Sequence, residues 1–123
     1  STRDLPALQA LSRLRPILDA SGWTWGVSGS AGFELATGVE ALHEGSDLDL
    51  ILRTPRFLDR LQARELLAQL DASICVVDMQ LQTPLGAVAL REWAGSSPRV
   101  LLKGNVQARL VSDPWQPSLE QVA

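Results

Sequence analysis

The sequence has 123 residues, of which 46% are apolar and 20% charged, and its formal net charge is −3 at pH 7, values typical of a single soluble domain. The acidic balance excludes broad binding to a nucleic acid polymer, which needs a basic face, and no apolar run approaches the ~20 residues that cross a membrane. Cys75 is the only cysteine, so an intrachain disulfide is excluded and a reducing, cytoplasmic setting is expected.

Hydrophobic periodicity and turn residues predict the elements of the first half of the chain. Leucine and isoleucine recur at helical spacing from Leu5 to Leu18, and strict alternation begins at Asp47. The predicted elements are, in order, an amphipathic helix from Leu5 that ends near Ser21 and Gly22, a strand over 23–27, a short helix over 30–36 closed by Gly38, and a strand over 47–52.

The second half continues the alternation of helices and strands. The predicted elements are a helix over 58–70, a central strand over 74–81, a short helix over 86–93, a hairpin of 99–103 with 107–111 around Gly104 and Asn105, and an extended tail over 113–117. This order predicts an α/β or α+β domain over residues 1–123, with a mixed central sheet flanked by helices.

The segment from Gly26 to Gly32 reads Gly-Val-Ser-Gly-Ser-Ala-Gly and lies between a predicted strand and a predicted helix. Glycines let the backbone approach a ligand closely, and a helix start offers free N–H groups, so Gly29 and Ser30 are candidate ligands for a phosphate. The alternative is a glycine-rich turn in which Ser30 only caps the helix.

Asp47 and Asp49 stand two residues apart at the start of a predicted strand. Residues at that spacing point to the same face, so both carboxylates can reach one metal ion. The alternative is a pair of solvated aspartates at a strand entrance, because such pairs also arise by chance.

Asp78 lies within the apolar run Ile74–Met79, which predicts a central strand. An ionised carboxylate in that environment needs a partner, water or a metal, and desolvation beside Asp47 and Asp49 would raise its pKa. The alternative is an edge-strand aspartate that faces solvent. Three carboxylates beside a phosphate-binding turn suit Mg²⁺, which prefers oxygen ligands, and they predict phosphoryl or nucleotidyl transfer.

Two further sets of residues have open interpretations. Lys103 and Arg53 follow apolar strands, so either could steady a triphosphate or stand as a solvated strand end. The four tryptophans could stack on adenine, but large aromatic residues mostly fill cores, and we expect at least three of them to do so: Trp23, Trp25, Trp93 and Trp115.

A glycine–serine turn, an Asp-x-Asp strand and a third acidic strand residue together resemble the DNA polymerase beta-like nucleotidyltransferases. The chain is more closely similar to the malonate decarboxylase holo-acyl-carrier-protein synthases, also called phosphoribosyl-dephospho-CoA transferases. The segments that carry this resemblance extend over nearly the whole chain: 25–38, 43–53, 78–84, 89–93, 100–103 and 113–115. Val27 and Ser28 depart from it, because proline and threonine are expected in the family's turn.

The resemblance implies a polymerase beta-like fold and transfer of phosphoribosyl-dephospho-CoA from triphosphoribosyl-dephospho-CoA to a serine of the acyl-carrier subunit of malonate decarboxylase. Asp47, Asp49 and Asp78 would bind Mg²⁺ and act in catalysis, while Gly29, Ser30 and Lys103 would bind substrate phosphates. Family members carry an additional N-terminal region that this sequence lacks, and a start at Ser1 with Met79 as the only methionine predicts a piece of a longer protein.

Two other functions stay open at this point. A small nucleotidyltransferase could use the same carboxylates to transfer AMP from ATP to a protein or a small molecule. A catalytically silent domain of the same fold could serve as a binding subunit, but the intact set of three carboxylates counts against it.

Overall fold

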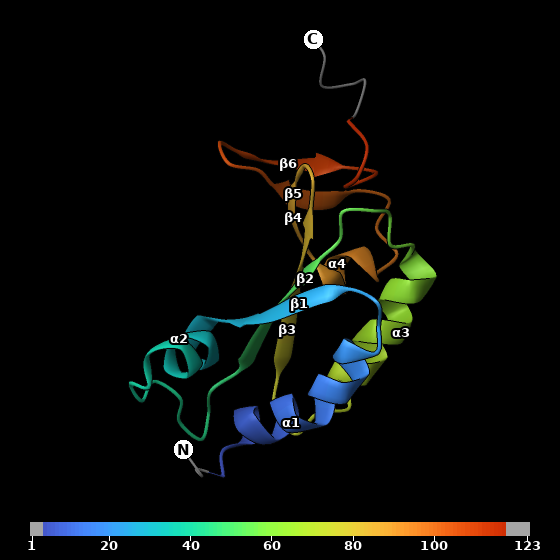
Figure 1. Cartoon of the computed structure of the whole chain (residues 1–123). Coiled ribbons are helices and arrows are strands. Elements are labelled where there is room, and N and C mark those ends of the chain that lie inside the picture. The colour runs from blue at the N-terminus through green and yellow to red at the C-terminus, as the bar shows by residue number, and fades with distance from the viewer. Residues whose placement is uncertain (1–3, 118–123) are drawn as a thin grey trace.

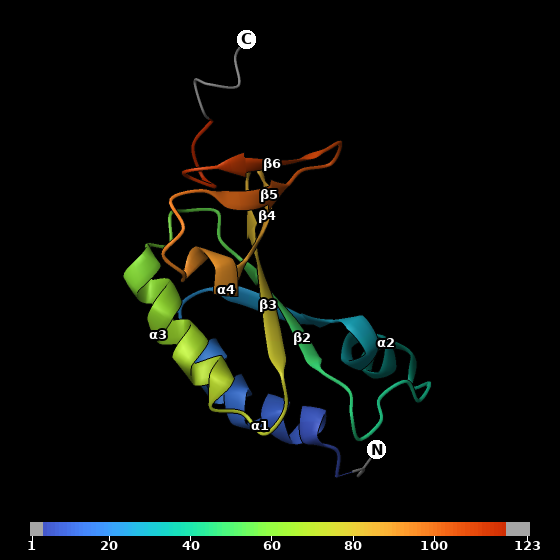
Figure 2. The ribbon, with the colours of Figure 1, turned by 180° about the vertical axis from the view of Figure 1, so that it is seen from behind.

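A computed structural model describes residues 4–117, in which one six-stranded sheet is covered by helices on one face (Figures 1 and 2). The elements follow in the order α1 (Pro6–Asp19), β1 (Thr24–Ser28), α2 (Gly29–Thr37), β2 (Leu48–Arg53), α3 (Arg60–Asp71), β3 (Val77–Thr83), β4 (Gly86–Ala89), α4 (Leu90–Trp93), β5 (Val100–Lys103) and β6 (Ala108–Val111). The α+β class with a mixed sheet is confirmed.

The strands lie in the sheet in chain order, β1 to β6. Only β2 and β3 run parallel, since α3 carries the chain back between them, and the other neighbours are antiparallel. Alternate residues of β2 and β3 are buried, including Leu48, Leu50, Leu52, Met79 and Leu81. These side chains face α1, α3 and α4 and form the core, whereas the intervening residues form an open face.

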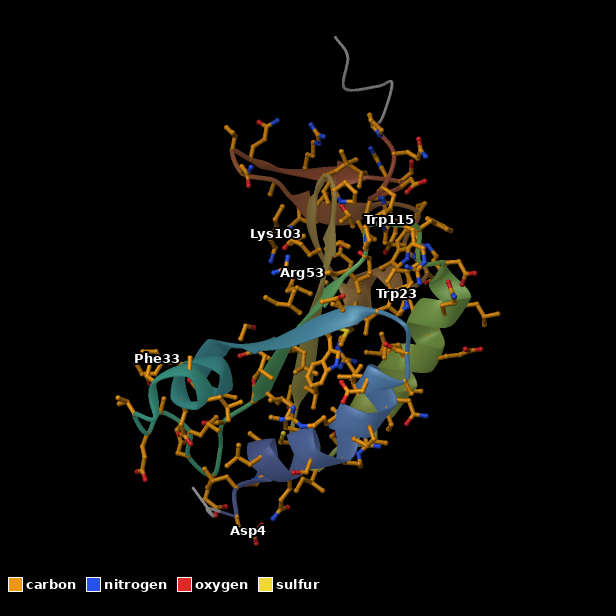
Figure 3. All side chains as sticks on the ribbon, viewed as in Figure 1. Asp4, Trp23, Phe33, Arg53, Lys103 and Trp115 are labelled. Atoms are coloured by element: carbon orange, nitrogen blue, oxygen red, sulfur yellow. The ribbon has the colours of Figure 1, made fainter. Side chains whose placement is uncertain are left out.

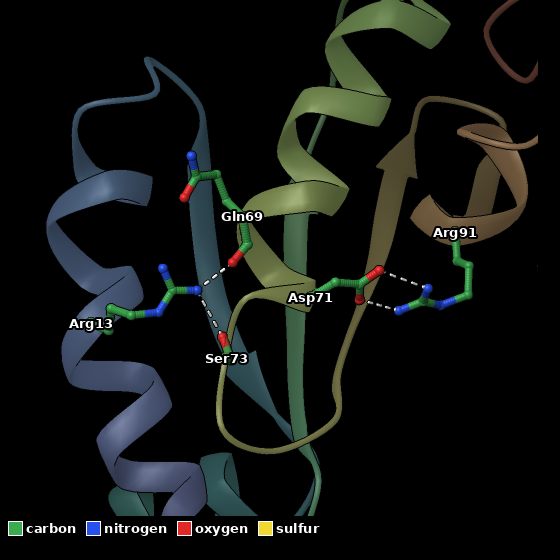
Figure 4. A network of polar contacts seen from close by, with 5 residues as sticks. All are labelled: Arg13, Gln69, Asp71, Ser73 and Arg91. Atoms are coloured by element: carbon green, nitrogen blue, oxygen red, sulfur yellow. Dashed lines mark hydrogen bonds and ion pairs between the residues drawn. The ribbon is translucent and has the colours of Figure 1, made fainter.

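The helices are those that the periodicity predicts. In α1 the buried stripe contains Leu11, Leu14 and Leu18, and α2 ends at Gly38, whose φ of 74° lies in the left-handed region. Arg13 of α1 donates hydrogen bonds to the Gln69 backbone oxygen and to Ser73 beyond α3, which ties these two helices together (Figure 4). No helix among residues 4–117 has the length and apolar character needed to cross a bilayer.

Two predicted boundaries were wrong. The helix expected over 86–93 begins only at Leu90, because residues 86–89 pair with β3 across a two-residue turn, from Thr83 to Gly86, and form β4. The strand expected over 74–81 begins only at Val77. Ile74 and Val76 are exposed, because the chain is still returning from α3 at these positions.

One of the four tryptophans lies in the core, where at least three were expected. Trp93 is buried, and its indole N–H donates to the Leu58 oxygen over 2.8 Å, while Trp23, Trp25 and Trp115 are partly buried against the core. The tail lies on the domain, because the indole N–H of Trp115 donates to the backbone oxygen of Thr54.

Asp59→Ala is expected to lower the free energy of unfolding by about 1 kcal/mol. Asp59 caps α3 by accepting a hydrogen bond from the Gln62 N–H, and the Gln62 side chain accepts from the Asp59 N–H in return. Urea denaturation measures the change, with Glu65→Ala on the same helix as control. Equal stability of wild type and Asp59→Ala would show that the cap contributes nothing.

Candidate active site

A row of polar residues crosses three strands near the end of β1. Ser28 on β1 pairs with Asp49 on β2, and Asp49 pairs with Asp78 on β3. Paired residues on neighbouring strands point to the same side of a sheet, so both carboxylates project from the open face. Asp47 precedes β2 by one residue, and its spacing from Asp49 directs it to that face as well. All three predicted aspartates therefore lie at one end of the open face.

The carboxylate of Asp49 is influenced by the charges of the two neighbouring aspartates. The pKa of Asp49 lies above its ordinary value, first because the carboxylate is partly desolvated and then because the charges of Asp78 and Asp47 repel its own. An excess of negative charge is thus concentrated at this end of the sheet.

The expected burial of Asp78 was wrong. Its strand, β3, is an inner strand with β2 and β4 on either side, but Asp78 itself is exposed. The reason is the pleat: β3 buries Val77 and Met79 against the helices and turns the residue between them to the open face. The desolvation predicted for Asp78 is found at Asp49 instead.

The glycine–serine turn lies directly beside Asp49. Helix α2 begins at Gly29, immediately after β1, and Gly29 has a φ of 61°, in the left-handed region that favours glycine. A Cβ atom at this position would lie 2.3 Å from the Oδ2 atom of Asp49. The backbone of the turn and the carboxylate therefore approach each other as closely as a glycine allows.

The start of α2 differs from the capping alternative considered for Ser30. The N-cap residue is Ser28, and its side chain makes no capping hydrogen bond, while Ser30 lies inside the first turn and is exposed. A helix start that its N-cap side chain does not satisfy has backbone N–H groups available to an anion. Gly29 and Ser30 stand where such an anion would be bound next to the carboxylates.

A cavity of about 290 Å³ borders Asp49 and Asp78 and includes two residues that the sequence analysis did not single out. Gln80 lines it, and the Oε1 atom of Gln80 is buried without a hydrogen-bond partner within residues 4–117. Arg91 lines it from α4 and donates hydrogen bonds of 2.6 and 3.1 Å to Asp71 (Figure 4). Gln80 lies two positions after Asp78 on β3 and so shares its face, a spacing signal that the sequence does carry. Arg91 gives no such signal, because only the pairing of β3 with β4 brings it to the site.

Lys103 is not at this end of the sheet. It pairs with Ala87, which pairs with Gln82, and Gln82 pairs with Arg53 at the far end of β2. Figure 3 shows Lys103 and Arg53 projecting on the same side of the ribbon. The structure therefore places Lys103 away from Gly29 and Ser30, with which it was predicted to bind substrate phosphates, and away from the three aspartates.

The three aspartates suit a divalent cation in chemistry and charge. They offer only oxygen donors, which Mg²⁺ prefers. A cation would relieve the repulsion by Asp78 and Asp47, which adds to desolvation in raising the pKa of Asp49. As the side chains lie, no three His, Cys, Asp or Glu residues of the described chain form a group able to hold one ion. The carboxylates would have to draw together to bind it.

The fold and the site define a class of protein: an α+β domain with a row of carboxylates beside an open helix start, suited to substrates that carry phosphate. Residues 1–114 match the family described as the phosphoribosyl-dephospho-CoA transferase MdcG C-terminal domain. The chain belongs to this family. No solved structure matches it.

Curated relatives agree with this assignment. The chain is 67% identical over 123 residues to a phosphoribosyl-dephospho-CoA transferase of Pseudomonas fluorescens strain Pf0-1, covering 100% of the chain and 59% of the relative. It is 57% identical over 114 residues to the Pseudomonas aeruginosa protein of the same name, covering 93% of the chain and 54% of the relative. The chain thus spans a little over half the length of these relatives.

Proposed function

We propose that this protein transfers phosphoribosyl-dephospho-CoA from triphosphoribosyl-dephospho-CoA to a serine of the apo acyl-carrier subunit of malonate decarboxylase, and that residues 1–123 form its catalytic domain. The observation that carries this proposal is the Ser28–Asp49–Asp78 row beside Gly29, in a chain whose relatives are named for this transfer. The reaction fits the cytoplasmic setting expected from the sequence.

In the proposed reaction, the serine oxygen attacks the phosphorus atom next to the ribose. A phosphodiester bond forms there, the bond to the outer two phosphates breaks, and diphosphate leaves. Asp47, Asp49 and Asp78 would hold Mg²⁺, which supplies charge stabilisation to the phosphate oxygens when bound. Asp78 is exposed on the open face, so it is also accessible to accept the serine proton.

The other residues of the site would position the leaving group. The N–H groups at the start of α2 and the Ser30 hydroxyl stand beside the carboxylates and can donate to diphosphate oxygens. Gln80 lines the neighbouring cavity, and its side-chain amide can exchange a hydrogen bond with a donor hydroxyl group.

Intact-mass spectrometry of the apo acyl carrier tests the proposal. After incubation with the protein, Mg²⁺ and triphosphoribosyl-dephospho-CoA, the carrier is expected to gain the mass of one phosphoribosyl-dephospho-CoA group, and a carrier with alanine at the modified serine is expected to gain none. A parallel incubation with ATP tests the alternative nucleotidyltransferase. A carrier modified with AMP, or left unmodified by both donors, would contradict the proposal.

Ser30→Ala is expected to lower kcat/KM by roughly 10-fold to 100-fold, the loss of a hydrogen bond to a charged phosphate. Because Ser30 is exposed and is not the N-cap of α2, the melting temperature should change little. Steady-state kinetics together with thermal denaturation measure both effects. Unchanged kinetics with a clearly lower melting temperature would instead assign Ser30 a purely structural role.

A further inference from the structure

A second pocket lies at the other end of the sheet from the carboxylates, around the paired residues Thr24, Arg53 and Gln82. It has a volume of about 400 Å³, and its lining includes Trp23, Thr24, Arg53, Arg56 and Gln82. We call it the distal pocket. Its volume lies in the range of pockets that bind small molecules, and none of the roles assigned so far uses it.

The distal pocket and the row of aspartates lie at opposite ends of the same face. Thr24 pairs with Arg53, and Arg53 pairs with Gln82, so these three residues form a row parallel to Ser28–Asp49–Asp78. Asp49 and Arg53 stand four positions apart on β2, which corresponds to about 13 Å along a strand. One elongated molecule on the open face could therefore reach both ends.

The charge of the distal pocket is opposite to that of the aspartate row. Arg53 and Arg56 line the pocket, and no Asp or Glu does so among the residues that the structure describes. Lys103 extends the Arg53 row across β3 and β4, and its side chain projects on the same side as Arg53 (Figure 3). Guanidinium groups recognise phosphate through paired N–H donors, so an anion is the ligand that this lining favours.

The walls of the pocket are held in place independently of any ligand. The guanidinium carbon of Arg56 lies 3.8 Å from the centroid of the Trp23 ring, so the arginine stacks on the indole. The Thr83 hydroxyl accepts hydrogen bonds from the Leu85 and Gly86 N–H groups and donates to the Pro114 oxygen. A site that is ordered before binding loses less conformational entropy when the ligand arrives.

We propose that the distal pocket binds the adenosine diphosphate portion of the dephospho-CoA group, an inference that rests on the proposed function. In that donor, a ribose separates the reacting triphosphate from the dephospho-CoA portion, which carries its own diphosphate. The two anionic parts need separate positions, and the open face provides a cationic pocket at the end opposite the aspartates. The same contacts would hold the group while it is transferred to the carrier.

Titration calorimetry with dephospho-CoA in the absence of Mg²⁺ tests this assignment, since dephospho-CoA lacks the reacting triphosphate. We expect Arg53→Gln and Arg56→Gln each to weaken its binding roughly 10-fold to 100-fold. A matched control should bind as wild type does: Arg99→Gln removes the same charge at an exposed position outside the pocket. Adenosine, which lacks the diphosphate, should bind more weakly and lose little in the arginine variants.

Binding and transfer are measured separately, so that the two proposals can fail independently. Loss of dephospho-CoA binding in both arginine variants supports the distal pocket even if no carrier is modified. Wild-type affinity in both folded variants, or no binding by the wild type, overturns it even if transfer is observed. If the variants bind dephospho-CoA normally but no longer bind the acidic surface of a carrier protein, the pocket is a protein-docking site and the assignment is wrong.

Discussion

Asp49→Asn is expected to reduce transfer to the acyl carrier by roughly 10³-fold or more, the loss of several kcal/mol of charge stabilisation around a bound cation. The pKa of Asp49 is raised first by its partial desolvation and then by the charges of Asp78 and Asp47, so its carboxylate stands between the other two. An asparagine side chain keeps the shape of the aspartate but cannot supply its charge. Single-turnover kinetics at saturating Mg²⁺ measure the loss.

The same substitution should not destabilise the fold. The pKa of Asp49 is raised in the folded protein, so the ionised carboxylate is disfavoured there relative to the unfolded chain. This unfavourable contribution is absent below the ordinary pKa of aspartate and appears as the pH rises through the raised pKa. Asp49→Asn should therefore be at least as stable as wild type at neutral pH, and the two should become equal in acid.

The effect of Mg²⁺ on the melting temperature tests the same site independently of activity. If the three aspartates bind the cation, Mg²⁺ should raise the melting temperature of the wild type but have little effect on Asp49→Asn. Glu65→Gln on α3 removes one negative charge elsewhere and should retain both activity and the response to Mg²⁺. Normal turnover by Asp49→Asn would exclude Asp49 from catalysis.

The sequence predicts those parts of the fold in which one face of an element is apolar and the other is polar. The stripe of α1, the alternation of β2 and the hairpin around Gly104 are found where they are expected. Prediction failed at residues 86–89, because the four-residue segment Gly-Ala-Val-Ala has no clear period of its own. It becomes a strand only because the turn after Thr83 folds it back onto β3.

Some residues of the candidate site could likewise be predicted from the sequence, and others could not. The placement of Asp47, Asp49 and Gly29 follows from strand spacing and from the direct junction of β1 with α2, both of which are local in the sequence. The positions of Arg91 and Lys103 depend on strand pairing over long separations, and the exposure of Asp78 depends on which face of β3 the helices cover. Local sequence patterns do not show which distant strands pair or which face of a strand the helices cover.

Gly29→Ala is expected to lower transfer by roughly 100-fold, because a displacement of about 1 Å in a reacting geometry can cost that much. The added Cβ would lie 2.3 Å from the Oδ2 atom and 3.2 Å from the Cγ atom of Asp49, so the carboxylate must rotate away. The loss of stability should be modest by comparison, about 1–2 kcal/mol from a left-handed alanine, since the end of an aspartate side chain can move.

Gly38→Ala is the matched control for this substitution, because it measures the backbone strain alone. Gly38 ends the same helix with a φ of 74°, and an added Cβ there has no atom within 4 Å. It should therefore lose a similar amount of stability while keeping its activity. Combining Gly29→Ala with Asp49→Ala should remove the clash with the carboxylate and leave only the Cβ atom of residue 49, 3.2 Å from the added Cβ. The cost of Gly29→Ala to stability should therefore fall toward that of Gly38→Ala. If Gly29→Ala and Gly38→Ala reduce transfer equally, the close approach of the turn to Asp49 has no role in positioning the carboxylate.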